Sequence, residues 1–256
     1  MSEIIATTKN KKYKYIKSLI QKKIRDREGV FTVEGKKSVD DAVASAYVVR
    51  LVAMSESFAQ NAQYNAETVI VRDDLFDGLC DTKTPQGIMA VIEKKDTDFI
   101  SDTEKLYVYC DNVSDPGNLG TIIRTADAAG MGGVLLSPGC ADAYSPKTVR
   151  SSMGSFFNID IVTGFEYNSL FELKGKGFQL VCGALCEDST DYTQTDFTNP
   201  TIIIVGNEAN GVSDDILKAS EHIIIPIYGK AESLNVGVAA SVLMYEAQRQ
   251  RRGGAG

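Results

Sequence analysis

Three stretches of this chain share one pattern, in which a short apolar run ends in a loop of small and polar residues and a helical pattern follows. They cover residues 105–130, 201–219 and 222–251. A buried strand that ends in such a loop and restarts as a helix is how α/β proteins present backbone N–H and C=O groups to a ligand. Because the last two loops are close in sequence, we expect them to line one pocket of an α/β fold.

The first third of the chain has a different organisation. Helical and strand patterns alternate up to residue 93, which predicts a small α/β sandwich of about 80 residues. The following segment is polar and charged and is typical of an interdomain linker. We therefore expect a first domain at residues 1–94, a linker at 95–104 and a second domain at 105–256.

Basic residues concentrate near the N-terminus, although the net charge of the chain is −7. Residues 9–27 contain nine Lys or Arg and a single acid, Asp26, and their apolar residues recur at the spacing of one helix. Such clustering is compatible with phosphate contact, and hence with RNA. A solvated face of an amphipathic helix is the more common origin of a charge run, and this alternative stays open.

The sequence lacks the residues or segments that several functional classes of protein require. No window approaches the roughly 18 apolar residues that a membrane span needs, and the N-terminus lacks the apolar core of a signal peptide, so we expect a cytoplasmic protein. The only histidine is His222, which leaves almost nothing for a catalytic triad or a His-ligated metal site, and no metal is expected. The five cysteines include no CxxC pair, so we predict neither a disulfide framework nor a zinc knuckle and interpret them as buried thiols.

The common nucleotide-binding motifs are also missing. There is no GxGxxG motif. Gly206 and Gly211 have the spacing of a Walker loop, but Val212 stands where the phosphate-binding lysine is required, so an ATPase is not supported. Asp214 and Asp215 begin a helical pattern, where we expect them to oppose the positive end of the helix dipole.

The three loops contain polar residues whose side chains could take part in binding or catalysis. Arg124 lies within a helix of small and apolar residues, where a buried guanidinium would need a partner. The alternative is a surface arginine paired with Asp127, one turn further on. The other candidates are Asn118, Asn207, Glu208, Glu232, Ser233 and Asn235.

These three loops resemble the three motifs of the SpoU–TrmH family of RNA 2′-O-ribose methyltransferases. The matching segments are DPGNLGTIIRTADAAG at 115–130, IVGNEANGVS at 204–213 and IPIYGKAESLNVGVAASVLMYE at 225–246. The segment VFTVEGKKSVDDAV at 30–43 is similar to the ribosomal-protein-like RNA-binding domain that the family appends. One departure is Gly237, where many members have serine.

The resemblance implies a fold and a cofactor. Members of the family have a parallel α/β sheet whose C-terminal part forms a deep trefoil knot, a topology that general rules make very rare. Their knot loops bind S-adenosyl-L-methionine, chiefly through backbone groups. The positions that match this cofactor site are Gly206, Ile225, Ile227 and Leu234.

The resemblance also implies the reaction, a methyl transfer to a ribose 2′-hydroxyl. Arg124 matches the family's essential arginine and is expected to hold the RNA phosphate and stabilise the alkoxide. By the same match, Asn118 would orient Arg124, Glu208 would anchor this network, and Ser233 and Asn235 would position the ribose. In the family a second subunit completes the site, which implies a homodimer through the C-terminal domain.

The substrate is not specified by the sequence. Ribosomal RNA is the first expected substrate and transfer RNA the second, because the appended domain accompanies large-subunit substrates in the family. Three competing interpretations stay open: a related knotted methyltransferase acting on a base, a non-catalytic RNA-binding or ribosome assembly protein with the same fold, and a small-molecule α/β enzyme.

Overall fold

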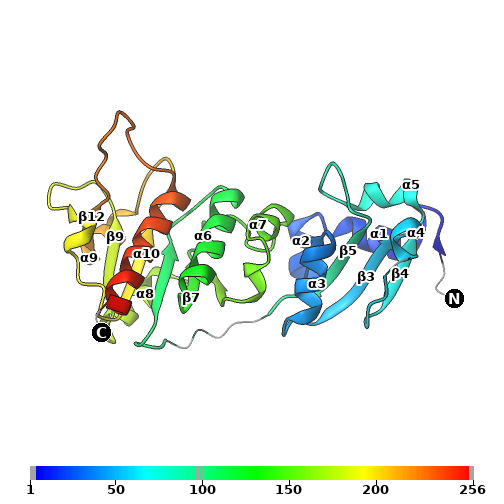
Figure 1. Ribbon diagram of the computed structural model, residues 1–256, viewed down its shortest axis with the longest axis horizontal. Coiled ribbons are helices and arrows are strands. Elements are labelled where there is room, and N and C mark those ends of the chain that lie inside the picture. Colours follow the sequence, from blue (N-terminus) through cyan, green and yellow to red (C-terminus); the bar gives the residue numbers. More distant parts are fainter. Residues whose placement is uncertain (1–3, 61, 96–98, 100, 254–256) are drawn as a thin grey trace. The chain divides into compact units, whose positions relative to one another are not determined.

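The computed structural model describes residues 4–60, 62–95, 99 and 101–253, and the chain forms two compact units (Figure 1). The first unit combines residues 1–96 with 144–157, and the second combines 97–143 with 158–256. Sequence analysis assigned 144–157 to the second domain. The predicted linker at 95–104 lies partly outside the described residues.

The first unit contains a five-stranded mixed sheet. Alternate side chains of its strands face opposite sides, and one face packs on a core that includes Tyr13, Ile16, Val91 and Phe76. In spatial order the strands are β1 (Ile4–Ile5), β4 (Thr68–Val71), β3 (Val49–Ser55), β5 (Ile88–Glu93) and β2 (Val30–Glu34), with β5 antiparallel to both of its neighbours.

The helices near the N-terminus of this unit differ from the sequence prediction. The single helix expected near residues 10–27 is wrong, because the chain forms two helices there. Arg25 is buried, and its Nη1 donates to the carbonyls of Leu19 and Ile20 at 2.8 and 2.7 Å, in the break between the helices. The helices are α1 (Lys11–Ser18), α2 (Lys22–Glu28), α3 (Lys36–Ala44), α4 (Glu56–Ala59) and α5 (Asp73–Phe76), followed by the 3-10 turn η1 (Asp77–Leu79).

Residues 144–157 complete the other face of this sheet. They form α7 (Pro146–Ser151) and the 3-10 turn η2 (Ser155–Phe157). The ring of Phe31, from β2, lies 5.1 Å from that of Tyr144 and 5.3 Å from that of Phe156, measured between centroids. Phe31 and Phe156 are fully buried, so this segment supplies part of the hydrophobic core of the first unit.

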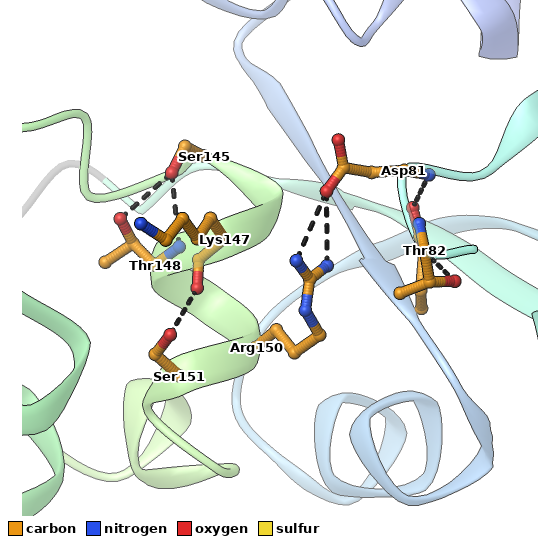
Figure 2. A network of polar contacts seen from close by, with 8 residues as sticks. Asp81, Thr82, Ser145, Lys147, Thr148, Arg150 and Ser151 are labelled. Carbon is orange, nitrogen blue, oxygen red and sulfur yellow. Dashed lines mark hydrogen bonds and ion pairs between the residues drawn. The ribbon is translucent and has the colours of Figure 1, made fainter. Parts of the chain in front are cut away.

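Polar contacts accompany this packing (Figure 2). Both terminal nitrogens of Arg150 lie 3.3 Å from the same oxygen of Asp81. Ser145 caps α7 by accepting a hydrogen bond from the backbone of Thr148. Because Arg150 and Asp81 are both solvent-exposed, their ion pair contributes little, and the aromatic core dominates the attachment of α7.

The second unit is built on a seven-stranded parallel sheet, as expected. Its central strands are buried along their whole length, which fits helices on both faces of the sheet. The apolar run at residues 156–161 does not form one strand, since residues 155–157 form η2 and the strand begins at Ile161. In spatial order the strands are β10 (Thr190–Asp191), β12 (Glu221–Ile224), β9 (Gln179–Gly183), β11 (Thr201–Val205), β6 (Leu106–Cys110), β7 (Gly133–Leu136) and β8 (Ile161–Thr163).

Two long helices of this unit, α6 (Pro116–Ala129) and α10 (Val236–Gly253), lie side by side (Figure 1). Asp115 caps α6 by accepting from the amides of Gly117 and Asn118 at 2.7 and 2.9 Å, so the helix begins within the DPGN sequence of the first loop. The shorter elements are α8 (Tyr167–Gly175), η3 (Tyr192–Gln194) and α9 (Asp214–Ala219).

Helix ends in the second unit agree with their local chemistry. Asp214 and Asp215 occupy the first turn of α9, which confirms their predicted place at the positive end of a helix. The beginning of α10 is apolar but not fully buried, because Val238 is 48% exposed. Within the described residues, no helix is both long and apolar enough to span a membrane.

Candidate active site

A cavity of about 640 Å³ lies at the carboxyl ends of β9, β11 and β12. Ligands of α/β proteins commonly bind at this edge of a parallel sheet, and the volume is typical of a small-molecule site. The structure brings Gly206, Ile225, Ile227 and Leu234 together in its wall, so all four residues predicted to contact the cofactor line one cavity. Ser233 lines it as well.

The wall of this cavity contains a tightly folded loop that begins at Gly206. Asn207 and Gly211 pair through their backbones, N to O, at 2.8 and 2.9 Å in the two directions. A Cβ atom at Gly206 would overlap backbone atoms of Gly211 and Val212. Only glycine therefore allows the loop to fold back on itself at this point.

Glu208 joins this loop to the start of α6. Its carboxylate accepts hydrogen bonds from the backbone and hydroxyl of Ser114 at 3.1 and 2.9 Å, from the backbone of Asp115 at 3.1 Å, and from the side-chain amide of Asn118 at 2.8 Å. These four donors surround both carboxylate oxygens, and together they fix the first and second loops against each other.

The same network reaches the third loop through Asn118. The side-chain amide of Asn235 donates to Asn118 Oδ1 at 2.9 Å. Asn235 Oδ1 in turn accepts from the backbone of Gly237 at 2.9 Å and of Val238 at 3.3 Å, which caps the start of α10. One chain of hydrogen bonds, Glu208–Asn118–Asn235, therefore connects all three loops.

The environment of Glu208 favours its charged form. Partial burial acts to raise the pKa of this carboxyl, but the hydrogen bonds from Asn118 and from backbone amides outweigh it and hold the pKa at about 2, against an ordinary value of 4.5. The stability that this shift contributes is complete above pH 4.5 and is lost as the pH falls towards 2.

Replacing Glu208 by glutamine gives a test of this network. The amide nitrogen of glutamine would face donors, so we expect the variant to be less stable than the wild type at neutral pH. The difference should shrink as the pH falls from 4.5 to about 2, because the wild-type carboxylate is then protonated. Denaturant unfolding of both proteins across this range measures it, and a difference independent of pH would contradict the assignment.

Arg124 lies on the exposed face of α6. It is six residues beyond Asn118, which corresponds to about 9 Å along the helix axis. Asp127 accepts instead from Asn158 at 3.3 Å, and within the described residues Arg124 forms no ion pair or side-chain hydrogen bond. Both the buried arginine and the Arg124–Asp127 pair are therefore wrong, and the guanidinium is free to contact a ligand.

The amino-acid sequence was compared with known protein families and curated proteins. Residues 105–245 match the SpoU rRNA Methylase family, and residues 10–90 match the MRM3-like substrate binding domain. The chain belongs to the SpoU rRNA Methylase family. A relative from Bacillus subtilis, 23S rRNA (guanosine(2553)-2′-O)-methyltransferase RlmP, is 36% identical over 94% of this chain and 97% of its own length.

Two further relatives differ in how much of the chain they match. The crystal structure of an AdoMet-bound rRNA methyltransferase from Sinorhizobium meliloti covers 97% of this chain and 98% of its own, with a TM-score of 0.87 and 31% identity. The tRNA (guanosine(18)-2′-O)-methyltransferase of Aquifex aeolicus is 38% identical, but over 66% of this chain and 77% of its own length.

In this SpoU family member, the structure places the predicted site residues in two groups. Ser233, Glu208, Asn235 and the four cofactor candidates line the cavity. Asn118 and Arg124 do not, and Asn118 bonds to Glu208 and Asn235 but not to Arg124. At Gly237, an added Cβ would lie 3.2 Å from both Asn235 Oδ1 and Thr121 Cγ2. Glycine thus fits a crowded helix start in this SpoU protein.

Sequence reasoning missed one residue of this site. Asp111 is fully buried at the end of β6 and accepts from the hydroxyl of Tyr167 at 2.8 Å, the amide of Asn112 at 2.7 Å and the backbone of Ser213 at 2.7 Å. It holds the first loop to the start of α9. Its position directly after an apolar strand was the only available signal, because two of its partners are 56 and 102 residues away.

Proposed function

We propose that this protein is an S-adenosyl-L-methionine-dependent methyltransferase that modifies a ribose 2′-hydroxyl in ribosomal RNA. The observation that carries this proposal is that the second and third family motifs line one cavity, and that Asn118 of the first motif is hydrogen-bonded to Glu208 and Asn235 in its wall. Full-length similarity to RlmP and to an AdoMet-bound rRNA methyltransferase supports both the substrate class and the cofactor.

The cavity suits this cofactor. Ile225, Ile227 and Leu234 offer apolar walls for the adenine, and Gly206 leaves the backbone open to close approach. The bound cofactor supplies an electrophilic methyl group on a sulfonium. The chain's own residues then have to hold the ribose oxygen in line with that methyl group and to stabilise its developing negative charge.

Arg124 is the residue that stabilises this charge. Its guanidinium is protonated at any working pH, so it holds the RNA phosphate and stabilises the alkoxide, and it does not remove the proton itself. Ser233 contacts the ribose from the cavity wall. Asn118, Glu208 and Asn235 are positioning residues, because their side-chain groups are occupied by bonds among the three loops.

The first domain, at residues 1–94, binds the RNA. Four lysines of this region, three of them on one face of α1, are exposed, and within the described residues they form no ion pair. Such a cationic face binds the phosphates of a long RNA. The four are Lys11, Lys14, Lys17 and Lys23.

Ribosomal RNA is favoured over transfer RNA by the coverage of the relatives. RlmP matches nearly the whole chain, including the substrate-binding region, whereas the Aquifex aeolicus tRNA enzyme matches two thirds of it. The proposed location of the protein is the cytoplasm.

We also propose that the protein is a homodimer and that its C-terminal domain is knotted. The exposed apolar side chains of α10, Val238 and Tyr245, are 48% and 55% accessible, and a second copy of the C-terminal domain covers them in a homodimer. The loops at 206–213 and 225–235 form a trefoil knot around the cofactor. The linker at 95–104 joins the RNA-binding domain to the methyltransferase domain at 105–256, from which the segment 144–157 packs into the first unit.

Nucleotide-resolution mapping of ribose methylation in total RNA tests the function. RNA from cells that lack the protein should miss one 2′-O-methyl group in ribosomal RNA, and the purified protein should restore it with S-adenosyl-L-methionine. A missing base methylation would instead identify a base methyltransferase. Failure of the protein to bind the cofactor at all would identify a non-catalytic RNA-binding protein.

A further inference from the structure

Three potential metal ligands meet at the edge of the second sheet, outside the lining of the cavity. Cys186 and Asp188 lie on the loop that leaves β9, and His222 lies in β12, the neighbouring strand. One ligand atom from each side chain falls within 4.8 Å of the others. We call these three residues the ligand cluster.

Both ring nitrogens of His222 face hydrogen-bond acceptors. Nε2 lies 2.8 Å from the carbonyl oxygen of Leu217, and because a carbonyl only accepts, Nε2 carries a hydrogen. Nδ1 lies 2.6 Å from a carboxylate oxygen of Asp188. An ionised carboxylate also only accepts, so at this distance a hydrogen lies between the two atoms, and a metal ion that bound both would replace it.

The third member of the cluster favours a metal ion. A proton needs only the imidazole and the carboxylate, whereas a sulfur, a nitrogen and an oxygen donor together are a typical zinc ligand set. The carbonyl of Leu217 is the kind of partner that orients a metal-bound histidine through its other ring nitrogen. Donor atoms around zinc are about 3.5 Å apart, and Asp188 is 73% exposed, so a small rotation of its side chain closes the site.

We propose that Cys186, Asp188 and His222 bind a Zn²⁺ ion, with water as the fourth ligand. The ion would have a structural role, because the same loop reaches the cavity. Ala184 and Leu185 line the cavity wall, and Ser189 closes the loop by donating to the carbonyl of Ala184 at 2.8 Å. A metal ion that joins this loop to β12 would hold that wall in place.

Sequence analysis expected no metal because His222 is the only histidine and the cysteines include no CxxC pair. The three ligands also have no recognisable spacing. Cys186 and Asp188 are two residues apart, but His222 follows 34 residues after Asp188. The strand and the loop come together because β12 pairs with β9 on one side, where His222 lies opposite Cys182, and with β10 on the other.

Zinc titration of the chelator-treated full-length protein, in competition with a chromophoric chelator, tests the proposal. We expect one Zn²⁺ per chain. The substitutions Cys186→Ser and His222→Gln should each weaken binding by at least about tenfold. Cys140→Ser is the matched control, a partly buried thiol of the same unit, and should bind zinc as the wild type does. Neither RNA nor cofactor is present, so the outcome is independent of the proposed methyl transfer.

Cobalt gives a second test that needs no variant. Co²⁺ bound to the wild-type protein should show a sulfur-to-cobalt charge-transfer band, and Cys186→Ser should lack it while Cys140→Ser retains it. Absence of this band from the wild type, or zinc binding no tighter than that of His222→Gln, would overturn the proposal. In that case His222 and Asp188 share a proton as a simple ion pair.

Discussion

Replacement of Arg124 by alanine should reduce methyl transfer to RNA by at least about a hundredfold, the effect typical of removing one donor that stabilises a developing oxyanion. The fold should be intact, because the side chain is exposed on α6 and, within the described residues, forms no bond that the substitution would break. Affinity for S-adenosyl-L-methionine should also be unchanged, since Arg124 does not line the cavity. Single-turnover transfer of labelled methyl groups and calorimetric cofactor binding measure the two effects separately.

Two further variants distinguish the effect of the Arg124 guanidinium from the effect of a positive charge alone. Arg124→Lys keeps the positive charge but loses the planar pair of donors, so it should recover only part of the activity. Arg249→Ala removes an exposed arginine of α10 that is paired with Glu246, and it should leave the rate nearly unchanged. If Arg124→Ala retained the rate of Arg249→Ala, the arginine would have no role in the reaction.

Gly206→Ala should abolish cofactor binding and destabilise the second unit. The added methyl group would overlap backbone atoms of Gly211 and Val212, and backbone has no rotamer with which to move aside. The loop would have to open, and its Asn207–Gly211 backbone pair would break. Calorimetry with S-adenosyl-L-methionine and thermal unfolding of the variant report the two losses.

Gly183→Ala provides the control in the same cavity wall. A Cβ there would lie 3.5 Å from Leu243 Cδ1, which is ordinary van der Waals contact, so this variant should fold and bind the cofactor. Equal cofactor affinity in the two alanine variants would show that the loop at Gly206 is not closed in solution in the way described here.

The sequence predicted those parts of the site that depend on local order along the chain. Each motif follows a buried strand of one parallel sheet, and parallel strands present their carboxyl ends at the same edge. Gly206, Ile225 and Leu234 were therefore expected to meet, and they do. The roles of these residues in binding and catalysis stay predictions.

Contacts between distant residues were not predictable in this way. Asn118 and Asn235 are 117 residues apart, and nothing in either motif states that one amide bonds to the other. The break between α1 and α2 depends on the buried Arg25, which the pattern of charges had assigned to an exposed basic run. A basic residue that packs and a basic residue that binds RNA look the same in a sequence.

The aromatic packing of residues 144–157 has a practical consequence for anyone who divides this protein. A fragment that stops at residue 94 would lack Tyr144 and Phe156. Phe31 would then be exposed to solvent on the uncovered face of the sheet. Such a truncation should aggregate rather than yield a usable RNA-binding module. The substrate-binding half and the catalytic half are interleaved in the gene, so neither can be exchanged between relatives by a single cut.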